Sequence, residues 1–281
     1  MNIKQEPINI CMCGNDKMVY GTLLTLLSVA KTTDRPLHVY FLTANINTGK
    51  NQFNSFRIED GKYIESILKR YNNCSVFDVV DCKDVFLDEF ADSTNMKSGY
   101  TPYAFMRLIV DELPINANKL LYLDTDLIIC KNIAELYDIE LSDYDVAMAM
   151  DQQACKWFGK KYCNSGVLLI NLRRIRLNCC FSNVRHVVNH RKMFMPDQTA
   201  LNIVCKNSRI KLNNKFNEQL ELNDKTVVRH YCKRFYVFPY IHTVNIKPWD
   251  IASMRNKFGD EIHKELFDEY LGYANKINLN N

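Results

Sequence analysis

The first third of the chain alternates between continuous apolar runs and longer segments whose apolar residues recur at helical spacing. Runs rich in β-branched and aromatic residues predict strands at 8–13, 36–43 and 74–80. Helices are predicted at 17–31 and 57–71. Because strands that alternate with helices usually form a parallel sheet, we predict an α/β fold with a mostly parallel sheet flanked by helices.

The rest of the chain continues this alternation with longer polar interruptions. Residues 84–101 are polar and irregular and are predicted as a loop, whereas 164–176 are predicted as a turn that leads into an apolar strand. The further predicted elements are helices at 102–113, 133–139, 178–192, 196–206 and 260–274, and a strand at 145–151. We expect a single domain over 1–281, with a core of about 8–250 and a C-terminal helical extension of about 251–275.

Two acidic residues interrupt the apolar run KLLYLDTDLIIC at 119–130. A carboxylate in an apolar interior is costly unless it is paired, so Asp124 and Asp126 need a partner. At the carboxyl edge of a parallel sheet, where such sheets bind ligands, these two side chains would flank Thr125 and point to the same side of the strand. They could then bind one divalent cation such as Mg²⁺ or Mn²⁺. The alternative is that both are solvated in a loop after a shorter strand.

The composition is that of an ordinary folded protein, with 47% hydrophobic and 24% charged residues. The formal net charge of +4, from 36 basic and 32 acidic residues, is too small to indicate nucleic acid binding, and it is compatible with a small anionic substrate. No apolar run reaches the roughly 18 residues that a membrane-spanning helix requires.

Cysteine usage indicates a reducing compartment. The chain has eleven cysteines, an odd number, and no C-x-x-C pair, which argues against a disulfide framework and against zinc-finger or ribbon sites. The N-terminus lacks the apolar core of a signal peptide. We therefore expect a cytoplasmic protein, with a position at the inner face of the membrane and peripheral membrane contact as the alternative.

Four sequence blocks occur in a recognisable order. They are KLLYLDTDLIIC at 119–130, NSGVLLINL at 164–172, PDQTALN at 196–202 and KPW at 247–249. Together with the N-terminal strand and YAFMRL at 103–108, they resemble the glycosyltransferases of family 8. That family has a D-x-D strand, an F-N-[AS]-G-V-[LM]-L-[IM]-N block, a P-D-Q-D-x-L-N block and a C-terminal K-P-W. The resemblance extends from residue 8 to about 250.

This resemblance implies a fold and an activity. The family fold is GT-A, a Rossmann-like nucleotide-binding sheet, and its members include bacterial lipopolysaccharide galactosyl- and glucosyltransferases and glycogenin. It implies retaining transfer of glucose or galactose from a UDP-hexose, with Mn²⁺ as cofactor or Mg²⁺ in its place. The acceptor would be a glycan such as lipopolysaccharide or another cell-surface polysaccharide.

The resemblance also implies roles for residues that match the family blocks. Asp124 and Asp126 would bind the metal, and Asp124 would also approach the ribose or the sugar. Asp197 would hydrogen-bond sugar hydroxyls, and Gln198 would lie near the anomeric carbon. Uridine and ribose would be held by Cys13, Gly14, Asn15 and Asp16. Lys247 would contact the diphosphate, and Arg107 would contact either the diphosphate or the sugar. The sugar ring would lie beside Asn164 and Ser165, and Thr125 is a further implied donor contact.

Two histidines are candidates for the third protein ligand of the metal. Family members usually read H-[FY]-x-G-x-x-K-P-W. Here His230 matches the local sequence but lies 17 residues before Lys247, and His242 lies near the lysine at a spacing one residue short. An insertion after His230 or a shifted ligand at His242 would each explain the pattern, and the apolar β-branched pair before His230 favours that residue.

The amide at position 198 bears on the mechanism. Retaining glycosidases normally use a carboxylate nucleophile, and an amide is a poor one. We therefore expect front-face attack by the acceptor within a short-lived ion pair. Two other functions compete: a nucleotidyltransferase that makes nucleotide sugars, which would normally carry a glycine-rich N-terminal loop, and a non-catalytic sugar-binding relative, against which the retained acids, Gln198 and Lys247 argue.

Overall fold

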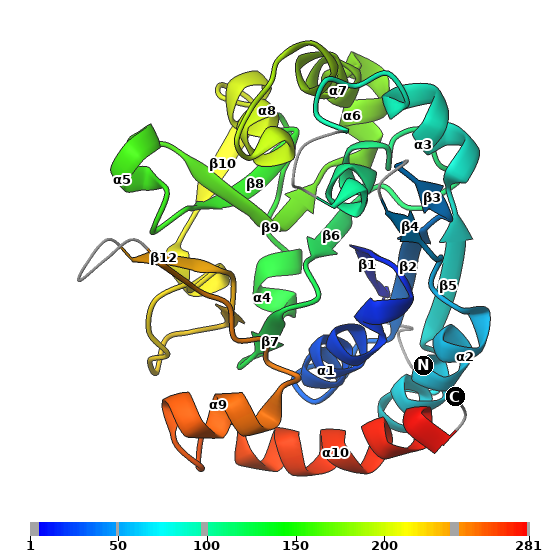
Figure 1. Ribbon diagram of the computed structural model, residues 1–281, viewed down its shortest axis with the longest axis vertical. Helices are drawn as coiled ribbons and strands as arrows, with labels where there is room; N and C mark the ends of the chain where they lie inside the picture. The colour runs from blue at the N-terminus through cyan, green and yellow to red at the C-terminus, as the bar shows by residue number, and fades with distance from the viewer. Residues whose placement is uncertain (1–5, 49–50, 97–100, 237–241, 280–281) are drawn as a thin grey trace.

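A seven-stranded sheet forms the centre of the protein (Figure 1). The computed structural model describes residues 6–48, 51–96, 101–236 and 242–279. In spatial order the strands are β10 (Arg209–Leu212), β8 (Val146–Met150), β9 (Cys163–Ile170), β6 (Leu120–Leu123), β1 (Ile8–Cys13), β2 (Leu37–Thr43) and β5 (Val76–Asp81). All neighbouring pairs are parallel except those of β9, which runs antiparallel to both β6 and β8. The predicted α/β fold with a mostly parallel sheet is confirmed.

Helices cover both faces of this sheet. One apolar core lies between the sheet and α1 (Val19–Ala30), α2 (Ile58–Tyr71), α9 (Ile251–Phe258) and α10 (Lys264–Leu279). The second lies between the sheet and α3 (Lys83–Phe90), η2 (Pro102–Leu108), α6 (Leu172–Asn178), α7 (Cys180–His190) and α8 (Pro196–Val204). Strand β1 serves both cores, because Ile10 and Met12 face the first and Cys11 faces the second. None of the described helices is both long and apolar enough to cross a bilayer.

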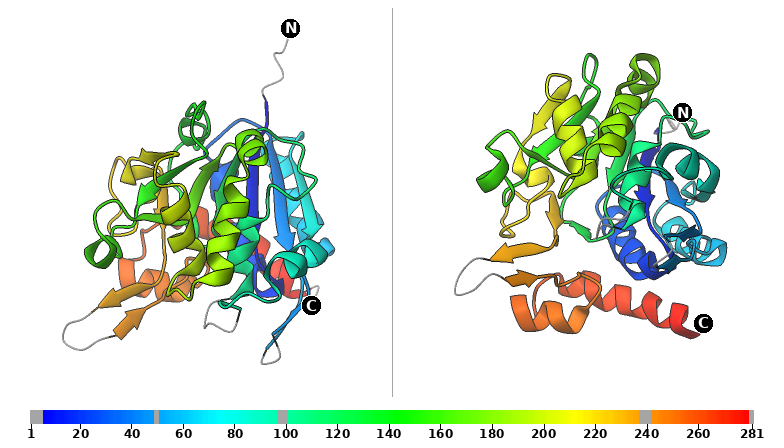
Figure 2. Two further views of the ribbon diagram at one scale, coloured as in Figure 1. Left: turned by 90° about the horizontal axis from the view of Figure 1, so that it is seen from above. Right: turned by 45° about the horizontal axis from the view of Figure 1, so that its top comes forward.

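Short elements outside the main sheet surround one of its edges. Strand β7 (Leu127–Ile129) leaves the main sheet and pairs antiparallel with β11 (Val228–His230). The hairpins β3 (Ile46–Asn47) with β4 (Gln52–Phe53), and β12 (Arg234–Tyr236) with β13 (His242–Val244), extend from the end toward which β2 and β5 point (Figure 2). The remaining short helices are η1 (Asp16–Met18), α4 (Ala134–Tyr137), α5 (Cys155–Phe158) and η3 (Asn214–Phe216).

The structure corrects several predicted elements. The loop predicted at 84–101 contains α3, because Phe86 and Phe90 lie one turn apart and are both buried in the second core; residues 97–100 lie outside the described part. The helix predicted at 102–113 is a 3-10 helix that ends at Leu108. The strand predicted at 119–130 is two strands, β6 and β7, separated by a turn at Asp124–Asp126. The predicted turn at Asn164 is instead the beginning of β9.

The reversed direction of β9 matters for the site. The amino end of an antiparallel strand lies at the same edge as the carboxyl ends of its parallel neighbours. Asn164 and Ser165, the second and third residues of β9, therefore lie beside Asp124, which follows β6. The backbone confirms this, since the N–H of Asp124 donates to the carbonyl of Gly166 at 2.9 Å.

Arg185 is a buried ionic centre that joins α3, η2 and α7. Its guanidinium lies 2.9 Å from Glu89, 2.7 Å from Asp111 and 2.7 Å from Glu112, and it donates to the carbonyl of Leu108 at 2.8 Å. Burial raises the pKa of Asp111, and Arg185 counteracts part of this effect. The arginine therefore offsets the cost of burying the Asp111 carboxylate.

An Arg185→Leu variant should lose about 3–5 kcal/mol in free energy of unfolding, because the buried Asp111 carboxylate would lose its partner. Urea unfolding measures this loss. Arg191→Leu, at the exposed end of the same helix, is the matched control and should change the free energy by no more than about 0.5 kcal/mol. Equal losses in the two variants would contradict the assignment.

Candidate active site

Asp124, Asp126 and His230 form a cluster at the carboxyl edge of the sheet. A ligand atom from each lies within 4.8 Å of the others. Nε2 of His230 is 3.2 Å from Oδ1 of Asp126 and 3.9 Å from Oδ2 of Asp124. The histidine is 3% exposed and Asp126 is 8% exposed. The two carboxylates converge as predicted, but through the turn between β6 and β7 and not through the alternation of one strand.

Pairing of β7 with β11 brings the histidine to the acids. His230 is the last residue of β11 and lies opposite Leu127, the residue after Asp126. The N–H of Tyr231 donates to the carbonyl of Asp126 at 3.0 Å, which fixes the turn against β11. Gly166 makes the close approach possible: a Cβ at this position would clash with the His230 ring and lie 2.7 Å from Oδ2 of Asp124.

The other candidate histidine, His242, lies elsewhere. It is on β13, stacked on the ring of Tyr236 with the ring centroids 5.2 Å apart. The cluster found among the described residues contains His230 in its place.

Lys247 supplies a positive charge to the cluster. Its Nζ lies 2.7 Å from Oδ2 of Asp126. Burial alone would raise the pKa of Asp126, but Lys247 and His230 outweigh it and hold that pKa well below its usual range. Burial likewise acts to lower the pKa of Lys247, and the Asp126 carboxylate more than compensates and raises it. Asp126 is therefore ionised and Lys247 protonated at neutral pH.

Arg107 connects Asp124 to the carboxylate of α8. It is buried on η2, with Nη2 3.0 Å from Oδ1 of Asp124 and Nε 3.4 Å from Oδ2 of Asp197. Its Nη1 donates to the carbonyl of Ser165 at 2.6 Å, and its guanidinium lies over the ring of Tyr122. Burial acts to lower the pKa of Arg107, but Asp124 outweighs it and raises that pKa. Burial raises the pKa of Asp197 despite the neighbouring arginine.

Asp197 and Gln198 begin α8, after Pro196 at its first position. Oε1 of Gln198 accepts from the N–H of Ser165 at 3.0 Å, and the Ser165 hydroxyl donates to Oδ2 of Asp197 at 3.2 Å. The blocks 164–172 and 196–202, which are far apart in the chain, therefore meet at this edge of the sheet. All three of these polar side chains are buried.

The N-terminal loop reaches the same edge from β1. The Cys13 thiol donates to the carbonyl of Tyr103 and lies 3.1 Å from the Tyr122 hydroxyl, which donates to Oδ1 of Asp124 at 2.8 Å. A Cβ on Gly14 would lie 2.6 Å from Cγ of Met18.

The rest of this loop is held by neighbouring segments. Asn15 pairs with Ser55 through a β-bridge, and the Asp16 carboxylate accepts from the Asn54 amide at 3.2 Å. The Thr125 hydroxyl is 3.5 Å from the Met18 sulfur, so the D-x-D turn adjoins the N-terminal loop.

Sequence reasoning missed Asp151, Asn217 and Tyr122. Asp151 follows the apolar strand β8 just as Asp124 follows β6, so an acid at the end of a buried strand was the available signal. Asn217 follows a 3-10 helix and carries no comparable signal. Tyr122 is within the apolar run of β6, where its hydroxyl is not evident from the pattern.

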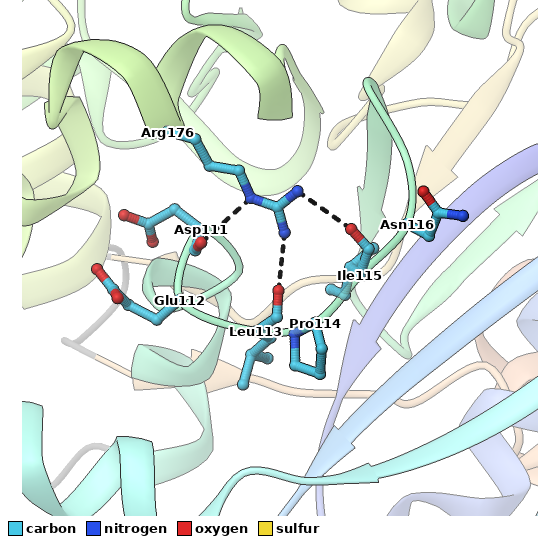
Figure 3. Close-up of a pocket in the computed structure, with 7 residues that line it drawn as sticks. All are labelled: Asp111, Glu112, Leu113, Pro114, Ile115, Asn116 and Arg176. Carbon is cyan, nitrogen blue, oxygen red and sulfur yellow. Dashed lines mark hydrogen bonds between the residues drawn. The ribbon is translucent and has the colours of Figure 1, made fainter.

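A pocket of about 500 Å³ lies beside the segment that joins η2 to β6 (Figure 3). Its lining includes Arg176, which donates to the carbonyls of Asp111, Leu113 and Ile115 at 3.2, 2.7 and 3.1 Å. The segment precedes β6, so this pocket adjoins the strand's amino end, opposite to Asp124. Arg176 thereby holds the connection between Arg107 and the strand that leads to the acids.

Comparison with known families identifies the chain. The model of glycosyl transferase family 8 matches residues 9–252. The chain belongs to this family. The predicted family, the GT-A fold and a hexosyltransferase activity are confirmed.

Individual relatives agree with this assignment. A Haemophilus influenzae protein with a provisional glycosyltransferase name is 25% identical in an alignment of 251 positions that covers 81% of this chain and 72% of that protein. The lipopolysaccharide glucosyltransferase WaaO of Escherichia coli (strain K12) is 24% identical over 88% of this chain and 75% of its own length. The crystal structure of the galactosyltransferase LgtC with donor and acceptor sugar analogues covers 93% of this chain and 96% of LgtC, with 18% identity and a TM-score of 0.62. This last likeness bears on the fold alone.

Proposed function

We propose that this family 8 enzyme transfers glucose or galactose from a UDP-sugar to a glycan acceptor, with retention at the anomeric carbon and with Mn²⁺ as cofactor. The observation that carries the proposal is the convergence of Asp124, Asp126 and His230 at one edge of the sheet. The acceptor class follows from the name of the Escherichia coli relative, a lipopolysaccharide glucosyltransferase. Lipopolysaccharide or another cell-surface polysaccharide is therefore the proposed acceptor.

The residues of the cluster fit a divalent cation of the first transition series. Two carboxylates and one imidazole are ligands that Mn²⁺ accepts, and the imidazole favours Mn²⁺ over Mg²⁺, which prefers oxygen alone. We assign Asp124, Asp126 and His230 as the ligands. When bound, the cation would stabilise negative charge on the diphosphate oxygens. His242, stacked on Tyr236, is assigned no metal role.

The remaining residues of this edge suit the parts of a UDP-hexose. We assign Lys247 and Arg107 to the diphosphate, because both are cationic and both contact an acid of the cluster. Asp197 would accept hydrogen bonds from sugar hydroxyls. The other proposed donor contacts are Cys13, Gly14, Asn15 and Asp16 for uridine and ribose, and Thr125, Asn164, Ser165 and Gln198 around the sugar.

The environment of Gln198 supports front-face attack. Its carbonyl oxygen already accepts a hydrogen bond from the N–H of Ser165, and an amide oxygen is a weak nucleophile. We propose that the bond between the anomeric carbon and the phosphate oxygen breaks as the acceptor hydroxyl attacks from the same face. The departing phosphate oxygen would take the acceptor's proton. No covalent sugar–enzyme bond is needed.

Calorimetric titration of the protein with UDP-glucose, UDP-galactose and GDP-mannose, with and without Mn²⁺, tests this proposal. We expect one UDP-hexose to bind at least about tenfold more tightly with Mn²⁺, because the cation would join the diphosphate to the acids. GDP-mannose is the matched control for the nucleotide and should not bind. Binding of no UDP-sugar under either condition would contradict the proposed donor, and equal binding with and without Mn²⁺ would contradict the proposed cofactor.

A further inference from the structure

Asp151 anchors two amide side chains of the site. It is 5% exposed and follows β8. Its Oδ2 accepts from Nε2 of Gln198 at 3.0 Å and from Nδ2 of Asn164 at 3.2 Å. Its Oδ1 accepts from the backbone N–H groups of Gln153 and Ala154. Because an ionised carboxylate only accepts hydrogen bonds, both amides must present their NH₂ groups to it.

Backbone donors confirm the orientation of both amides independently. The N–H of Gly166 donates to Oδ1 of Asn164 at 2.9 Å, and the N–H of Ser165 donates to Oε1 of Gln198 at 3.0 Å. A backbone N–H can only donate, so the atom facing it must be the amide oxygen. The positions of the oxygen and the nitrogen in each amide are therefore determined by its hydrogen bonds to Asp151 and to a backbone N–H.

The same logic extends to His230 through Asn217. Asn217 is fully buried, and its Nδ2 donates to Oδ1 of Asn164 at 2.9 Å. Its own Oδ1 therefore faces Nδ1 of His230, at 2.9 Å, and must accept from it. In the neutral imidazole the proton is then on Nδ1. Nε2 faces the carboxylates, 3.2 Å from Oδ1 of Asp126, so its lone pair is available to a bound cation, and in the absence of a cation a second proton on Nε2 satisfies the same contact.

We propose that Asp151 and Asn217 are positioning residues that fix the tautomer of His230 for metal binding. Asp151 and the backbone N–H of Gly166 together set the direction of the chain Asp151–Asn164–Asn217–His230, and Asp151 and the N–H of Ser165 together orient the amide of Gln198. The orientation of the His230 ring nitrogens and that of the Gln198 amide therefore both depend on hydrogen bonds that lead back to Asp151. A histidine ligand whose second nitrogen donates to a fixed acceptor binds metal more tightly, and loss of such a partner typically costs 10–100-fold in affinity. This inference rests on one part of the proposed function, namely that a cation binds at Nε2 of His230. It does not depend on the proposed donor or acceptor.

The wild-type protein provides the first test. Side-chain ¹⁵N NMR spectra of the metal-free protein at pH 8, with the signals assigned by a His230→Gln variant, report which nitrogen carries the proton. We expect a proton on Nδ1 of His230, either alone or together with a proton on Nε2 that is donated to Asp126. A neutral ring protonated only on Nε2 would overturn the inference, whatever the variants show.

Two variants provide the second test. Asp151→Asn places an NH₂ group either against both amide NH₂ groups or against the backbone N–H groups of Gln153 and Ala154, and it thereby disturbs the start of the chain. Asn217→Ala removes the acceptor of the Nδ1 proton. Both should weaken Mn²⁺ binding about 10–100-fold, although neither residue belongs to the cluster. Electron paramagnetic resonance of free Mn²⁺, without any sugar nucleotide, measures this, and circular dichroism confirms that each variant is folded.

Asp145→Asn is the matched control. Asp145 precedes β8 as Asp151 follows it, is 3% exposed, and is bonded to Arg174 and Asn178 away from the chain described above. Its variant should keep the wild-type Mn²⁺ affinity within about twofold. If the wild type binds Mn²⁺ and the folded Asp151 and Asn217 variants bind it equally well, the inference fails and the proposed function stands. If the wild type binds no Mn²⁺, the proposed cofactor fails and the NMR result alone decides the tautomer.

Discussion

An Asp126→Asn variant is expected to lose glycosyl transfer by about a thousandfold or more, or about 4 kcal/mol in the barrier. Asp126 contacts both His230 and Lys247, so it links the proposed metal ligand to the proposed diphosphate contact. An amide of the same shape keeps one oxygen ligand but removes the negative charge that pairs with Lys247 and that would pair with the metal. Mn²⁺ affinity and charge stabilisation in the transition state should fall together.

Initial rates of UDP release, measured over a range of Mn²⁺ concentrations, test this expectation. Asp138→Asn is the control, because Asp138 has a side chain that is 61% exposed and pairs only with Arg35 in the described ion pairs. Its rate should stay within about twofold of the wild-type rate. Transfer by the Asp126 variant within tenfold of the wild type, at the same Mn²⁺ concentration, would remove this residue from the proposed metal site.

An Arg107→Leu variant is expected to lose about 3–5 kcal/mol of stability and nearly all transfer. The buried guanidinium lies between Asp124 and Asp197, and its removal leaves two neighbouring carboxylates without their shared partner. Arg107→Lys keeps the charge but cannot make the same set of contacts, so it should recover part of the stability and little of the activity. Urea unfolding and transfer assays on the two variants separate the effects.

The stability deficit of Arg107→Leu should depend on pH. Burial already raises the pKa of Asp197 in the folded wild type, and loss of the arginine would raise it further. A folded state that holds protons more tightly than the unfolded state loses stability as pH rises. The deficit should therefore be larger at pH 8 than at pH 5. Arg173→Leu, on the exposed side of α6, should show no such dependence, and a deficit independent of pH would argue against carboxylate repulsion.

The sequence was sufficient for the layered fold and for the residues that meet at one edge. Continuous apolar runs predicted β1, β2 and β8 because each of these strands is buried from both faces of the sheet, so almost every position is apolar. Short strands were missed for the opposite reason. Strand β10 has only four residues, Arg209–Leu212, and two of them are charged. It lies at the edge of the sheet, where it is defined by its pairing with β8, and a local pattern does not predict that pairing.

Long-range pairing also limits what local pattern predicts about the site. The convergence of Asp124 and Asp126 was predicted from strand alternation, yet the chain turns between them and β7 pairs outside the main sheet. The choice between His230 and His242 depends on this pairing, which no local spacing encodes. Asp151 and Asn217 act through single hydrogen bonds to other side chains, so only the folded arrangement reveals them.

The pairing of β7 with β11 has a consequence for the timing of synthesis. Asp126 and Lys247 are separated by 121 positions in the chain. At about 5–20 residues per second, a ribosome would need roughly 6–24 seconds between them. During that interval the strands before Asp126 can already pair, whereas the histidine and the lysine have not yet emerged. The nascent chain would hold two acids at the edge of a partly formed sheet for several seconds before β11 and Lys247 complete the site.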